Sequence, residues 1–194
     1  MSRWLIVLLI ASTAYADPET PLADELGDQG VGVEAGLAAG GRVTPGGFRI
    51  TGHYLYQLTD REWFDGGASF TFGSGSAQCF RDRMNAYLCE HGVADGEGFE
   101  ISATVRHYFE PQGEFLPFVR GGLGLAVVRF PADGVSGFAI PLHIGGGVRY
   151  AVSDAVAVTG QGELQIGFGD FGHGLGMEPQ LGLGVIAGAE FPLR

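Results

Sequence analysis

Apolar and polar side chains alternate with a period of two over most of this chain, and that alternation restricts its fold more than any other feature. In the segment 156–168, Val158 and Ile166 share one parity while Gln161 and Glu163 share the other. A period of two is that of a β-strand with one apolar and one polar face, whereas an amphipathic helix repeats every ~3.6 residues. Eight segments alternate in this way, at 31–39, 48–58, 64–72, 99–109, 117–128, 138–150, 156–168 and 181–191.

The links between these segments alternate in length. Glycine makes up 35 of the 194 residues, which disfavours long helices, and no stretch reaches the ~18 apolar residues that a membrane-spanning helix needs. An even number of strands, joined by short turns on one side and longer loops on the other, predicts an all-β fold: an eight-stranded antiparallel up-and-down transmembrane β-barrel, or meander. The short turns lie at 59–62, 110–114 and 152–155, and the longer glycine-rich links at 40–47, 73–98, 131–137 and 169–179.

The aromatic residues indicate which face meets the lipid. On the apolar face they gather at the strand ends, which is typical of girdles at the two lipid interfaces. A soluble barrel with its apolar face turned inward is the alternative. One girdle is predicted on the loop side from Phe48, Phe72, Phe99, Phe138 and Phe168, and the other on the turn side from Tyr56, Phe64, Phe109, Phe115, Tyr150 and Phe191.

Charged side chains within the strands fall almost entirely on the polar face. Acids and arginines are nearly equal in number there, so we expect them to pair inside a narrow barrel, because buried charges require partners. Glycines on the same face would make room for the large charged groups. The predicted polar network of the barrel interior, or lumen, consists of Glu34, Arg49, His53, Asp65, Glu100, Arg106, Arg120, His143, Arg149, Glu163 and Glu190.

The N-terminus predicts export. Residues 1–16 have the parts of a secretory signal peptide: Arg3, an apolar run, and an Ala-Tyr-Ala cleavage motif that ends at Ala16. Cleavage there would leave an acidic, flexible tail at 17–29, followed by the barrel at 30–194. The chain carries 22 acidic residues against 11 basic ones, a balance that excludes nucleic acid as a partner.

The two cysteines, Cys79 and Cys89, lie close together in the longest loop. Such a pair in an exported protein predicts a disulfide, with free thiols as the alternative. A metal site is less favoured, because two cysteines and His91 fall short of four ligands. The same loop carries apolar residues such as Phe80 and Met84, so it is either a surface for a ligand or partner or a passive cover of the barrel mouth.

Two stretches resemble the small eight-stranded outer-membrane barrels of Gram-negative bacteria, the OmpA and OmpX type. One is FLPFVRGGLGLAVV at 115–128, similar to an aromatic-x-Pro-aromatic-Val entry into a glycine-rich strand, and the other is GGGVRYAVSDAVAVTGQGEL at 145–164, similar to a hairpin with a short turn. The last strand resembles the signal read by the barrel assembly machinery, except that three residues follow Phe191. The resemblance implies a monomer in the cell outer membrane, in contact with outer-membrane lipid and lipopolysaccharide and inserted by that machinery.

Together these features predict a non-enzymatic barrel with a plugged polar lumen that serves structural or surface-interaction roles through its loops. The alternatives are a narrow OmpW-like channel for small solutes, a lipid A-modifying enzyme, and a soluble periplasmic ligand-binding barrel. The His-x-Ser pattern of lipid A deacylases is absent, since His107 is followed by Tyr108 and Phe109. A metal site built from His53 and His143 with Glu34 or Glu100 is not expected, because its ligand geometry and the groups that fix the histidine tautomers would have to be assumed. We therefore predict no catalytic residue, cofactor or metal.

Overall fold

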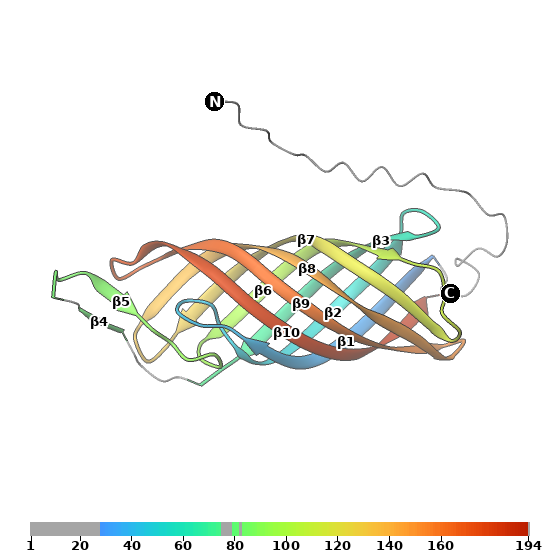
Figure 1. Cartoon of the computed structure of the whole chain (residues 1–194), viewed down its shortest axis with the longest axis horizontal. Coiled ribbons are helices and arrows are strands. Elements are labelled where there is room, and N and C mark those ends of the chain that lie inside the picture. The colour runs from blue at the N-terminus through green and yellow to red at the C-terminus, as the bar shows by residue number, and fades with distance from the viewer. Residues whose placement is uncertain (1–27, 75–78, 82, 194) are drawn as a thin grey trace, which may run out of the picture.

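The computed structural model, which describes residues 28–74, 79–81 and 83–193, is a closed antiparallel β-barrel (Figure 1). Around the barrel the strands follow the order β1-β10-β9-β8-β7-β6-β3-β2, so each strand is paired with its neighbour along the chain apart from an insertion between β3 and β6. The eight barrel strands are β1 (Gln29–Ala39), β2 (Gly47–Gln57), β3 (Glu62–Phe72), β6 (Glu97–Tyr108), β7 (Phe115–Phe130), β8 (Val135–Ser153), β9 (Val156–Phe171) and β10 (Gly176–Leu193).

The barrel closes where β1 pairs with β10, in a register that runs from Gln29 opposite Leu193 to Ala39 opposite Leu183. Strand β1 begins one residue before the boundary predicted at residue 30, because Gln29 also lies opposite Tyr56 of β2. The predicted signal peptide and nearly all of the acidic tail lie outside the described residues. The predicted all-β, eight-stranded meander is confirmed.

A small hairpin lies beyond one end of the barrel. It consists of β4 (Cys79–Arg81) and β5 (Tyr87–Cys89), inserted between β3 and β6, and it projects past the strand ends (Figure 1). No helix in the part of the chain that the structure describes is long and apolar enough to cross a membrane.

The prediction of two long loops, at 131–137 and 169–179, is wrong. Strands β7 and β8 are joined by the turn 131–134, and β9 and β10 by the turn 172–175. Strand pairing continues beyond the predicted strand ends because Phe130 and Phe171 point inward and pack in a buried apolar cluster. The apolar surface that they bury stabilises the additional pairs. Long connections remain only at 40–46 and 73–96, within the described residues.

The distribution of apolar and charged side chains in the barrel is the reverse of that in a soluble protein. Leu37 and Val185 on its outer face are 68% and 73% exposed, whereas Arg106 and His143 inside are 0% exposed. A soluble ligand-binding barrel would hold apolar groups inside and charges outside, so this interior does not fit that alternative. An apolar outer face with a charged interior is the pattern of a membrane barrel.

Pairing between strands brings predicted girdle residues level with one another. Phe48 of β2 lies opposite Phe72 of β3, and Phe115 of β7 lies opposite Tyr150 of β8. The Phe115 and Tyr150 rings are in contact, with centroids 5.4 Å apart. Phe109, however, lies one residue beyond the end of β6, in the connection to β7.

Candidate functional site

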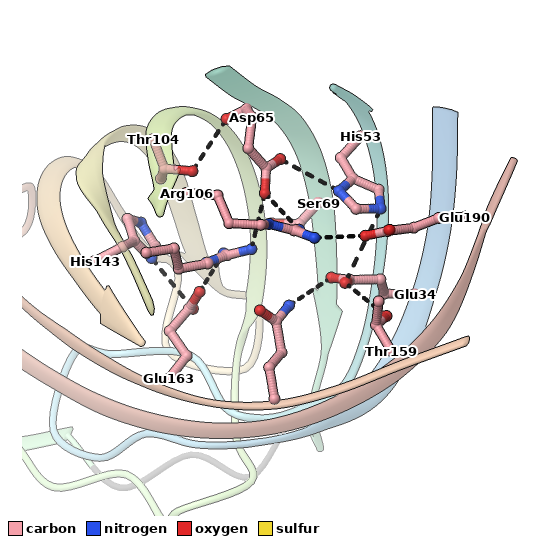
Figure 2. Close-up of polar contacts among 12 residues, drawn as sticks. Glu34, His53, Asp65, Ser69, Thr104, Arg106, His143, Thr159, Glu163 and Glu190 are labelled. Carbon is pink, nitrogen blue, oxygen red and sulfur yellow. Dashed lines mark hydrogen bonds and ion pairs between the residues drawn. The ribbon is translucent and has the colours of Figure 1, made fainter. Parts of the chain in front are cut away.

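All eleven residues of the predicted lumen network lie inside the barrel, each no more than 7% exposed. They come from β1, β2, β3, β6, β7, β8, β9 and β10, so every barrel strand contributes to one connected set of polar contacts. Figure 2 shows part of this set, with the side chains directed toward one another across the interior.

Eight of these residues form one continuous chain of alternating charges. At the end near the short turns, Arg149 Nε lies 3.0 Å from Glu190 Oε2, and Glu190 Oε1 lies 2.5 Å from Arg106 Nη1. Arg106 Nη2 then contacts Asp65 Oδ2 at 2.7 Å, and the same oxygen lies 3.5 Å from Arg120 Nη1. Asp65 therefore joins the two halves of the chain.

The other half continues from Arg120 to Glu163, which it contacts through Nη2. Glu163 Oε1 accepts a hydrogen bond from Arg49 Nη1 at 2.9 Å, and Arg49 Nη2 lies 3.3 Å from Glu100 Oε1. The His143 ring fits between two of these acids, 3.0 Å from Glu100 and 3.2 Å from Glu163. Arg49, Arg106 and Arg120 each lie between two carboxylates, and Arg149 contacts one. Every guanidinium of the chain thus has a carboxylate partner, the arrangement that makes burial of charge tolerable.

Glu34 stands apart from this chain. It is the only one of the five lumen acids with no arginine within ion-pair distance among the described residues. Its Oε2 accepts a hydrogen bond from Gln161 at 2.8 Å, and its Oε1 accepts one from Thr159 at 3.4 Å. His53 approaches Oε1 to 4.0 Å while its Nδ1 lies 3.2 Å from Asp65.

Glycines fit around these groups as the sequence predicts. A Cβ atom at Gly124 would lie 2.9 Å from His143 Nε2 and 3.0 Å from the Glu100 carboxyl carbon. A Cβ at Gly145 would lie 2.8 Å from the Gly162 carbonyl oxygen of the adjacent strand. A side chain at either position would push into space that the charged network or the neighbouring backbone fills.

Two apolar clusters inside the barrel were missed by the sequence analysis. Each closes one end of the lumen, so the polar network lies between two apolar layers. Their signal is present in the sequence, because Phe118 and Phe130 share the parity of Arg120, and parity alone places them inside. The turn-end cluster is Leu55, Trp63, Tyr108 and Phe118, and the loop-end cluster is Val43, Cys89, Ala126, Val128, Phe130, Val135, Ala139 and Phe171.

The loop-end cluster also holds the hairpin. Cys79 and Cys89 are joined by a disulfide, with Cα atoms 4.0 Å apart and opposite each other in the hairpin register. Just after the hairpin, the His91 ring stacks on Phe130 with centroids 3.8 Å apart, and its Nε2 lies 2.7 Å from Asp133 Oδ2. Its Nδ1 contacts the carbonyl oxygen of Arg42. His91 therefore ties together three separate connections, and its role was also missed.

Two groups of side chains within the described residues are close enough to share a metal ion. One consists of Cys79, Cys89 and His91, but the disulfide removes both thiolates as ligands. The other consists of Glu34, His53 and Glu190.

The fold and the charged, closed interior together define the class of small eight-stranded outer-membrane β-barrels. Among solved structures, the chain is similar to Neisserial surface protein A, with a TM-score of 0.63 and 16% identity over 86% of this chain and 97% of that one. It is also similar to the outer membrane protease OmpT of Escherichia coli, with a TM-score of 0.50 and 10% identity over 87% and 97% of the two chains. Neither a protein-family model nor a curated protein matches the sequence.

These likenesses establish the fold and point to the outer membrane. Because one of the similar barrels is named a protease, the fold by itself does not separate enzymes from non-enzymes. The particular role therefore has to be argued from the residues of this chain.

Replacing both cysteines by serine is expected to loosen the hairpin without unfolding the barrel. The disulfide closes a short loop, with a sequence separation of 10, outside the barrel strands. Its loss should weaken hairpin order by about 2–3 kcal/mol. Trypsin should then cleave after Arg81 or Arg83 in the folded barrel more than about tenfold faster than in the wild type. Equal cleavage rates would show that the anchoring at His91 alone fixes the hairpin.

Proposed function

We propose that this chain is a non-enzymatic outer-membrane barrel with a closed interior, which serves as a rigid support for the disulfide-stapled hairpin β4–β5. The observation that carries this proposal is the anchoring of the hairpin base to two other connections through His91. Loops on membrane barrels need no such fixing if they merely cover the lumen, whereas a binding surface gains affinity from being held in one conformation.

The exposed side chains of the hairpin support a contact role. Phe80 is 48% exposed and Met84 is 84% exposed. Arg81 is held by Tyr87, whose ring centroid lies 5.8 Å from the guanidinium carbon, and donates a hydrogen bond to the carbonyl oxygen of Asn85. Exposed apolar groups on an ordered ribbon are typical of a surface that meets a protein partner.

The proposal includes the environment of the barrel. The apolar outer face would contact outer-membrane lipid and lipopolysaccharide, and the hairpin end would face outward, as the long loops of such barrels do. Insertion would require the barrel assembly machinery acting on β10. Neighbouring copies are not needed to close the sheet, so we propose a monomer.

A closed interior predicts that the purified barrel does not conduct. The alternating charges cross the lumen between two apolar clusters, so a hydrated ion would have to break several buried ion pairs to pass. Planar-bilayer recordings at neutral pH should show no steady current, with a porin in the same bilayer as the positive control. A steady current that grows with the number of inserted barrels would instead favour the narrow-channel alternative.

Removal of the hairpin tests the contact role directly. Cells that display a variant with 80–88 replaced by a glycine-serine linker should be retained several-fold less on glass coated with matrix protein than cells displaying the wild type. The double substitution Phe80→Ser and Met84→Ser should give most of that loss. Val152→Ser is the matched control, because Val152 lies at the opposite end of the barrel and its exposure, 58%, falls between those of Phe80 and Met84. Unchanged retention of all variants would leave the hairpin as a passive cover.

A further inference from the structure

We propose that Glu34, His53 and Glu190 form a binding site for one divalent transition-metal ion, with Zn²⁺ as the reference, inside the barrel. One ligand atom from each residue can be chosen so that the three lie within 4.8 Å of one another. The side chains of Glu34, His53 and Glu190 are only 1%, 1% and 3% exposed. Imidazole nitrogen and carboxylate oxygen are ligands that zinc accepts.

The orientation of His53 is the strongest argument. Its Nδ1 lies 3.2 Å from Asp65 Oδ1, which favours the tautomer that carries its proton on Nδ1 and leaves the Nε2 lone pair free. A histidine that donates one ring N–H to a carboxylate and binds a metal with the other nitrogen is the usual arrangement of zinc-ligating histidines. Here Nε2 is buried and has no hydrogen-bond partner within the described part of the chain. It faces Glu34 and Glu190 (Figure 2).

The charge distribution favours a cation at the same point. The lumen holds five acids against four arginines, and Glu34 is the acid with no arginine. Gln161 and Thr159 fix the Glu34 carboxylate through neutral hydrogen bonds, which add no positive charge beside it. A metal ion between Glu34 and His53 would supply a positive charge beside Glu34 and a partner for His53 Nε2 together.

The neighbouring strand makes room for the His53 ring. Gly32 lies opposite His53 in the β1–β2 register, and a Cβ atom at this position would collide with His53 Nε2. Ligand atoms around a tetrahedral zinc ion lie roughly 3.3–3.5 Å apart, so Glu34 and His53 would rotate toward Glu190 to complete the site. Glu190 would share its carboxylate between the ion and its partners Arg106 and Arg149. Glu190 also borders a small cavity at the turn end, beside Arg149 and Trp63. A water molecule there would contact Glu190, the one of the three ligands that lines this cavity.

His143 provides the matched control. It is equally buried, but its two nitrogens face two different carboxylates, each already paired with an arginine. Both acids beside His143 therefore have arginine partners, whereas Glu34 beside His53 has none among the described residues. A metal that merely adheres to lumen histidines would not distinguish His143 from His53.

The experiment uses the untagged full-length chain, refolded in detergent with ZnCl₂ and without chelator or reductant, so that the cysteines stay oxidised. Folding is verified by the difference in electrophoretic mobility between unboiled and boiled samples. After gel filtration, mass spectrometry of the metal should find about one zinc ion per folded chain. Glu34→Gln and His53→Asn should lower this content at least about tenfold, and His143→Asn should not.

A measurement on the wild type alone keeps the proposal testable if a variant fails to fold. Electron paramagnetic resonance of the Cu²⁺-loaded barrel should show hyperfine coupling to the nitrogen of one imidazole, with oxygen in the other positions. A folded wild-type barrel that retains no zinc overturns the site. Coupling to several imidazoles, or zinc retained equally by His53→Asn, also overturns it.

Discussion

Arg106→Met is expected to destabilise the barrel by about 3–5 kcal/mol, because it leaves two buried carboxylates without their shared partner. Arg106 is 0% exposed and contacts Asp65 at 2.7 Å and Glu190 at 2.5 Å. Its guanidinium carbon also lies 4.5 Å from the centroid of the Phe118 ring, so the side chain joins the polar network to the turn-end apolar cluster. Methionine keeps much of the volume and removes the charge.

Denaturant titration in micelles would measure this change. Trp63 is 2% exposed and stands edge-on to Tyr108, with ring centroids 6.3 Å apart, so its fluorescence reports on the same end of the barrel. Arg61→Ala is the control, because its partner Glu110 is largely exposed and the pair spans 3.6 Å at the surface. Surface pairs contribute about 0–1 kcal/mol. A midpoint shift for Arg106→Met no larger than that of the control would show that the ion-pair chain does not hold the barrel together.

The membership of the lumen network could be predicted because strand geometry alone assigns it. A period of two sends every second side chain inward, so Glu163 and Arg49 are both placed in the lumen without any knowledge of pairing. Which acid meets which arginine could not be predicted, because it depends on strand tilt and stagger. Arg49 and Glu163 are separated by 114 residues, and nothing local in the sequence relates them.

The contacts of His91 at the loop end of the barrel could not be predicted from the sequence. His91 acts through Asp133 and the Arg42 carbonyl, which lie 42 and 49 residues away in connections without regular structure. No periodicity relates residues in separate loops, so the sequence identifies the cysteine pair but not the base on which it rests. The apolar clusters differ in this respect, because Phe118 and Phe130 lie on strands whose parity was already known.

The charge network and the apolar clusters depend on each other. Ion pairs strengthen as water is excluded, and the clusters at both ends of the lumen exclude it. Lipid offers no polar partner to the outer face of the strands. Within the membrane, charged side chains can therefore specify strand pairing only from the interior. The network is therefore best understood as a device for specifying the barrel, with Glu34 as its one acid that has no arginine partner among the described residues.

Gly122→Ala is expected to destabilise the barrel by about 1–3 kcal/mol, the usual effect of forcing a methyl group into a fully packed interior. A Cβ atom at Gly122 of β7 would collide with the Ala103 carbonyl oxygen of β6 and lie 2.8 Å from Thr104 Cγ2. Because the nearest of these atoms belong to the paired backbone, a rotamer change of one side chain cannot relieve the overlap, and β6 and β7 must separate.

Gly160→Ala is the matched control for this prediction, since a Cβ atom at Gly160 of β9 would meet nothing within 4 Å. That variant should be neutral or more stable by about 0.4–1 kcal/mol, because alanine restricts the unfolded chain. The same titration compares the two, with the mobility of unboiled samples showing that both variants form barrels. Equal destabilisation by both substitutions would mean that the strands need glycine for flexibility during insertion. A loss of stability confined to Gly122→Ala would identify close strand contact inside the lumen as the reason for glycine at that position.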